Sequence, residues 1–172
     1  MQRFASYLRQ MGLRGAIALA IAVTAVACAV LGGGSDNLPK ARGFRVLAPP
    51  GWREFDKGEG DRAYQLPSGS VATLNTSCKR TAAPLEVLTR QLLMGSRNVK
   101  ILKRDNLRID GADGLHSSLR VTEDGTPLRL EVLVLRKGNC TFDFTLMNAK
   151  EIGHGEIADF LTFARSLRYG AD

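Results

Sequence analysis

The clearest alternation of apolar and polar positions lies between Leu128 and Met147. Two runs of β-forming residues, 128–136 and 140–147, flank the sequence Lys137-Gly138-Asn139, and this arrangement predicts a β-hairpin. The second run alternates with a period of two, with Cys140, Phe142, Phe144 and Leu146 on one face and Thr141, Asp143 and Thr145 on the other. Such a strand buries one face, so we expect the core of the domain to lie against the cysteine-phenylalanine face.

Four further runs are typical of strands. Residues 62–66 and 70–78 flank Pro67-Ser68-Gly69 and predict a second hairpin. The run Phe44–Leu47 is expected to be a short strand that ends before Pro49, because proline cannot donate to a β-ladder. Residues 115–121 alternate in the same way and are expected to precede the 128–147 hairpin.

The run Val99–Ile109 differs from the other strands because basic residues interrupt it. Lysine side chains commonly protect the edge of a sheet against unwanted pairing, so we expect a solvated edge strand here. Trp52, which follows the proline pair, is expected to pack over the end of the core.

Two segments have helical periodicity. Leu85, Leu88 and Leu92 follow Pro84 at spacings that predict an amphipathic helix over residues 84–94. A closing helix is predicted where apolar residues recur at helical spacing, with acids near its start and arginines near its end, at Ile157, Phe160, Leu161, Ala164 and Leu167. The predicted fold class is therefore α+β, an antiparallel sheet of six to seven strands with packed helices.

The N-terminus has a different composition from the rest of the chain. Arginines at positions 3, 9 and 14 precede an apolar run, Ala16–Leu31, which is typical of a signal peptide or membrane anchor. We therefore divide the chain into a membrane-targeting segment (1–31), a linker (32–42) and one domain (43–169). The residues Ala25-Val26-Ala27-Cys28 form an imperfect lipobox, so Cys28 is a candidate lipidation site. An uncleaved membrane anchor and a cleaved soluble form remain alternatives.

The charge balance places one limit on partners. The chain carries a net charge of +7, and since residues 1–27 contain three arginines and no acid, the rest carries +4. This is a mild excess, and binding to nucleic acid would call for basic residues clustered on one face. We therefore expect no nucleic-acid partner.

Cys78 and Cys140 are the two cysteines of the predicted domain, and each lies on the apolar face of its strand. Outside the cytoplasm, two such thiols pair when their Cα atoms come within about 7 Å. We expect a Cys78–Cys140 disulfide, with two separate buried cysteines as the alternative.

Residue patterns for catalysis or metal binding are missing from the sequence. Its two histidines, His116 and His154, are far apart, and His116 falls on the expected solvent face of its strand. There is no Gly-x-Ser-x-Gly elbow, phosphate-binding glycine loop or dinucleotide fingerprint. We expect no catalytic residue, no metal site, no cofactor and no enzymatic activity.

Several of these motifs together resemble a known family. The segment Phe44–Trp52, the leucine-rich helix, the Asp110–Gly114 turn and the long hairpin are similar to PsbP-like proteins. The segments Asn75–Cys78 and Gly138–Asp143 resemble those of small uncharacterised delta-proteobacterial envelope lipoproteins. The resemblance implies a PsbP-like α/β/α sandwich that serves in binding and assembly.

These expectations lead to a first functional hypothesis and one main alternative, and an enzyme with an unrecognised site remains a third. The first is a non-enzymatic envelope protein that faces the periplasm, is attached to the membrane by an anchor or lipid, and acts with an envelope protein partner as an assembly or accessory module of a larger complex. The alternative is a periplasmic binding domain for a small apolar ligand or lipid. A flat exposed apolar patch would favour the first hypothesis, whereas a large apolar cavity under the 84–94 helix would favour the second.

Overall fold

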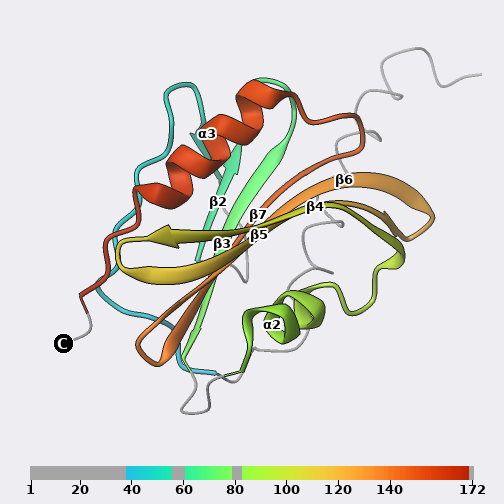
Figure 1. Cartoon of the computed structure of the whole chain (residues 1–172). Helices are drawn as coiled ribbons and strands as arrows, with labels where there is room; N and C mark the ends of the chain where they lie inside the picture. Colours follow the sequence, from blue (N-terminus) through green and yellow to red (C-terminus); the bar gives the residue numbers. More distant parts are fainter. Residues whose placement is uncertain (1–37, 56–60, 79–82, 171–172) are drawn as a thin grey trace, which may run out of the picture.

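The computed structural model describes residues 38–55, 61–78 and 83–170. These residues form one seven-stranded antiparallel sheet with the strand order β1-β2-β3-β7-β6-β5-β4. Helices α2 (Leu85–Leu92) and α3 (His154–Arg165) cover opposite faces of the sheet (Figure 1). The strands are β1 (Arg53–Glu54), β2 (Arg62–Gln65), β3 (Val71–Cys78), β4 (Arg97–Ile109), β5 (Ala112–Glu123), β6 (Thr126–Lys137) and β7 (Cys140–Asn148). The predicted α+β fold class is confirmed.

The β6–β7 hairpin lies at the centre of the sheet, as predicted. Lys137 pairs with Cys140 across a tight turn at Gly138, whose φ of 59° is a conformation that glycine adopts without a steric penalty. Phe142 and Phe144 are fully buried, so the expected core face of β7 is confirmed.

The larger apolar core lies between the sheet and α3. Phe160 and Phe163 of the helix are fully buried, and Phe163 makes edge-on ring contacts with Phe144 of β7 and Tyr64 of β2. Trp52 packs against Phe163 at a ring-centroid distance of 5.4 Å, which confirms its predicted position over the core. Aromatic packing therefore holds α3 against one face of the sheet.

A second, smaller core lies under α2. Leu119 of β5 and the β6 residues Leu130 and Val132 are fully buried there. The helix packs three partly buried leucines against this cluster, namely Leu85, Leu88 and Leu92. Both faces of the sheet are thus covered, which gives the α/β/α layers.

The predicted strand at Phe44–Leu47 is wrong. Arg45 forms an isolated bridge with Arg168, which follows α3, and its backbone N–H and C=O are both used there. The ladder does not extend to Leu47 because the N–H of Leu47 donates to the Ser166 hydroxyl at 2.7 Å. The first strand of the sheet is instead the short β1, which the sequence pattern did not indicate.

Glu156 joins the start of α3 to the β2–β3 hairpin. Its Oε1 accepts hydrogen bonds from the hydroxyls of Ser68 at 2.5 Å and Ser70 at 2.6 Å, and its Oε2 accepts one from the Gly153 N–H at 3.1 Å. Partial burial raises the pKa of this carboxyl, but the three hydrogen bonds outweigh burial and hold the pKa below its ordinary value.

Replacing Glu156 with glutamine is expected to lower the free energy of unfolding by about 1 kcal/mol, because hydrogen bonds to a carboxylate are stronger than those to an amide. A lowered folded-state pKa means that the carboxylate stabilises the fold above its ordinary pKa and that this contribution is lost as the pH falls through the folded-state value. The wild type should therefore lose more stability than E156Q between neutral and acid pH. Urea unfolding at a series of pH values checks this, and parallel curves for the two proteins would contradict it.

Candidate functional site

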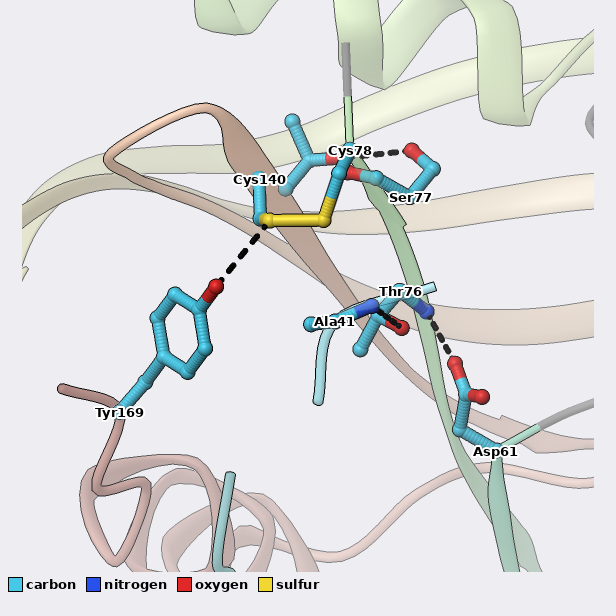
Figure 2. The surroundings of a disulfide bond; sticks show 8 residues. Ala41, Asp61, Thr76, Ser77, Cys78, Cys140 and Tyr169 are labelled. Atoms are coloured by element: carbon cyan, nitrogen blue, oxygen red, sulfur yellow. Dashed lines mark hydrogen bonds between the residues drawn. A yellow bond between two sulfur atoms is a disulfide. The ribbon is translucent and has the colours of Figure 1, made fainter. Parts of the chain in front are cut away.

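The structure contains the predicted disulfide between Cys78 and Cys140 (Figure 2). The two residues lie directly opposite one another at the ends of β3 and β7, and their Cα atoms are 4.0 Å apart. The Cys140 sulfur lies 3.4 Å from the Tyr169 hydroxyl, so the bond also contacts the segment that follows α3. This cross-link ties two central strands together and has a structural role.

The surroundings of the disulfide are organised by backbone hydrogen bonds. The N–H of Ala41 donates to the Thr76 hydroxyl at 3.0 Å, and the N–H of Thr76 donates to a carboxylate oxygen of Asp61 at 2.5 Å (Figure 2). These bonds hold the segment that enters the domain beside β3.

The candidate lipidation site, Cys28, lies outside the described residues, so lipidation stays a prediction. Among residues 38–55, 61–78 and 83–170, no helix has the length and apolar character needed to cross a membrane. The same part of the chain has no group of three or more histidine, cysteine or acidic side chains placed to hold a metal ion.

The expected solvent exposure of His116 is wrong. His116 is buried on the α3 face of β5, where its ring lies 6.2 Å from that of Phe160 and its Nε2 lies 2.9 Å from Oε2 of Glu131. The sequence pattern assumed that only one face of the sheet is apolar, whereas both faces are covered by a helix. Alternate residues of β5 are therefore buried on opposite sides.

Glu131 is a buried ionisable residue that the sequence analysis did not identify. It is fully buried, and its Oε2 accepts a hydrogen bond from the Ser118 hydroxyl at 2.6 Å in addition to its contact with His116. The signal was in the sequence, because Glu131 falls on the same parity of β6 as Leu133 and Leu135. An acid in an apolar row is expected to have buried partners.

The arrangement of this cluster does not match a nucleophilic relay. A serine nucleophile needs a hydrogen bond to a histidine that is oriented by an acid. Here the Ser118 hydroxyl donates to Glu131, and His116 binds the same carboxylate oxygen. The three buried side chains therefore contact one another through Oε2 of Glu131, while its Oε1 is buried without a hydrogen-bond partner among the described residues.

A different region carries most of the exposed apolar side chains. In the described part of the chain seven large apolar side chains are exposed, and five of them lie between residues 87 and 102: Val87, Met94, Val99, Ile101 and Leu102. The last three belong to β4, where 42%, 49% and 40% of their surfaces are exposed. All eight residues from Arg97 to Arg104 are exposed, and we call residues 97–104 the β4 surface.

The net charge of the chain is also concentrated in β4. This strand contains five basic residues and one acid, a net charge of +4, and residues 1–27 contribute +3. Since the whole chain carries +7, the remaining residues contain equal numbers of acids and bases. The mild positive charge of the chain beyond residue 27 therefore resides in one edge strand.

Most basic residues of the β4 surface have no ion-pair partner. Lys103 lies 2.8 Å from Asp105, whose hydrogen bond and charge raise the pKa of the lysine and keep it protonated. Within the described residues, Arg97, Lys100 and Arg104 form no ion pair. The predicted basic edge strand is confirmed, and its exposed apolar side chains add a feature that a guarded edge does not require.

Comparison with known proteins identifies the fold. No protein-family model and no curated protein matches the sequence. A solved structure of a Bacteroides thetaiotaomicron VPI-5482 protein is similar with a TM-score of 0.55 and 16% identity, over 81% of this chain and 49% of that one. The chain thus spans about half the length of that protein.

Cyanobacterial PsbP (CyanoP) from Synechocystis sp. PCC 6803 is similar over almost its whole length. The TM-score is 0.53 at 18% identity, and the match covers 80% of this chain and 95% of CyanoP. The domain therefore has a PsbP-like fold, as the resemblance implied.

Proposed function

We propose that the protein is a non-enzymatic accessory module of the bacterial cell envelope. In this proposal the N-terminal segment, by an anchor or a lipid on Cys28, holds the protein on a membrane with its PsbP-like domain in the periplasm. The domain then docks through its β4 surface and supports the assembly or action of a larger envelope complex.

The observation that carries the proposal is the β4 surface itself. Exposed apolar side chains interleaved with unpaired basic ones favour contact with another structure, since single-domain proteins rarely gather exposed apolar residues without such a contact. In the most deeply buried polar cluster of the described residues, His116 and Ser118 both contact the carboxylate of Glu131. Together these features support docking rather than chemistry.

The alternative is a periplasmic binding domain for a small apolar ligand or lipid. Such a ligand would be expected between the sheet and α2. The leucines of α2 already pack there against Leu119, Leu130 and Val132. The packing favours the accessory role over ligand storage.

An affinity purification of the full chain tests the proposal. The chain, with a tag at its C-terminus, is expected to stay with the membrane fraction after a high-salt wash and to bring down an envelope protein in mild detergent. The captured protein, used in turn as bait, should recover this chain. Release by salt alone, or recovery of lipid without any envelope protein, would contradict the proposal, and the second result would favour the alternative.

The Cys28→Ser variant separates the modes of attachment. If Cys28 is lipidated, the variant should lack the mass of the lipid and lose membrane attachment, whereas an uncleaved anchor should retain the variant on the membrane. Intact-protein mass spectrometry of the membrane and soluble fractions distinguishes these results.

A further inference from the structure

The β4 surface combines two kinds of side chain that are rarely exposed together on a strand. Basic side chains lie on both sides of the edge, because Lys103 pairs with Ser118 on the α3 face and Arg104 pairs with Ser117 on the α2 face. Ile101 lies just before this pair in the sequence and is half-exposed. A partner that approaches the edge of the sheet therefore meets basic side chains on both faces of the strand and exposed apolar side chains beside them.

Protection of the edge explains only part of this composition. Charged side chains on an edge strand prevent pairing with other chains, and a few of them are enough. That role accounts for Lys100 and Lys103, but it does not account for the exposed Val99, Ile101 and Leu102. Exposed apolar residues on an unpaired strand would increase aggregation unless they are covered in the working protein.

Addition of a partner strand does not fit the geometry of this edge. The pairing of β4 with β5 shifts register twice, between Arg97 and Lys100 and between Ile101 and Lys103. Asn98 adopts a positive φ of 51°, which interrupts the extended backbone. Such irregularities break the regular row of N–H and C=O groups that an added strand would need.

We propose that the β4 surface rests on the anionic phospholipid surface of the membrane to which the protein is tethered. Basic groups attract anionic headgroups, and apolar side chains between them enter the interfacial region of the bilayer. Neither contact requires a regular strand edge. The inference rests on the proposed function for the tether, and it assigns a lipid surface as the occupant of the docking site.

Charge complementarity supports this occupant. Each lysine or arginine near an anionic bilayer strengthens attachment about fivefold. The excess charge of the domain is carried by the same strand that exposes Val99, Ile101 and Leu102. The domain would then lie edge-on, with α2 and α3 on either side of the contact and neither covered by the membrane (Figure 1).

Hydrogen exchange of the full chain in nanodiscs tests the contact. The outward N–H groups of an edge strand have no ladder partner, so they exchange quickly unless something covers them. Nanodiscs of phosphatidylcholine alone are compared with nanodiscs of phosphatidylcholine and phosphatidylglycerol in equal parts. Peptides from residues 97–104 should exchange more slowly on the anionic discs only, whereas peptides from α3 should exchange equally on both.

Paired charge reversals provide the variant and its control. Lys100→Glu with Arg104→Glu should reduce the added protection of residues 97–104 by at least about tenfold. Lys150→Glu with Arg165→Glu makes the same change in net charge at two exposed positions outside β4 and should keep the protection. Thermal unfolding of both variants checks that the fold is unchanged. Added salt should weaken the protection, because the Debye length falls to about 3 Å at 1 M.

The contrary results separate the two proposals. Equal exchange on neutral and anionic discs, with the protein still inserted, would overturn the lipid contact and leave the tether intact. Protection that appears only when an envelope protein is added would assign the surface to that protein. A chain that does not insert would contradict the tether, and its sedimentation with anionic but not neutral vesicles would then decide the β4 contact by itself.

Discussion

Replacing both Cys78 and Cys140 with alanine is expected to lower the free energy of unfolding by about 4 kcal/mol. The bond links residues 62 positions apart, and a cross-link of that span strongly restricts the unfolded chain. A loss of this size is a large part of the stability of an ordinary domain, about 5–15 kcal/mol. Urea unfolding of the full chain in mild detergent measures it through the fluorescence of Trp52, which packs against Tyr64 and Phe163.

The remaining cysteine provides a matched control. Cys28→Ala removes a thiol without touching the cross-link, so its unfolding curve should match that of the wild type. Reductant should destabilise the wild type and this control equally and leave the double alanine variant unchanged. Equal stability of the wild type with and without reductant would show that the bond does not stabilise the fold.

The sequence predicted the elements around this disulfide better than their arrangement. The alternation in 140–147 and the turn at Gly138 predicted the hairpin, because both signals are local. Parity placed Cys78 and Cys140 on apolar faces, but parity cannot show which strands are neighbours. The β3–β7 pairing crosses from one hairpin to another, and long-range packing decides it.

The two errors have a common physical origin. Phe44–Leu47 has strand-like residues, but the hydroxyl of Ser166, 119 positions away, takes the N–H of Leu47 and ends the ladder. The alternation in its strand placed His116 on the face expected to contact solvent. In the structure α3 covers that face, and Phe160 packs against the His116 ring. In both cases a tertiary contact overrode a local preference.

The β4 surface shows the opposite case. Its basic residues were visible in the sequence and indicated an edge strand. The sequence could not show that Val99, Ile101 and Leu102 stay exposed, because apolar residues in a strand are ordinarily expected to be buried. The exposure, and not the charge, identified the candidate docking surface.

Replacing Glu131 with leucine is expected to lower the free energy of unfolding by about 3 kcal/mol. Glu131 is fully buried, and its loss would leave both His116 and Ser118 without the carboxylate that each contacts. Chemical unfolding measures the change. Glu54→Leu is the matched control, since Glu54 is an exposed acid of a strand whose ion pair with the exposed Arg62 should contribute less than about 1 kcal/mol.

A triple variant distinguishes the cost of unpaired polar groups from the cost of a side chain that fits poorly at position 131. If the cost of Glu131→Leu comes from unpaired polar groups, adding His116→Leu and Ser118→Ala should recover most of it, because an apolar set replaces the whole cluster. A triple variant as unstable as the single one would instead show that leucine does not fit at position 131. Recovery of stability without loss of docking would show that the cluster maintains the fold and that docking does not need it.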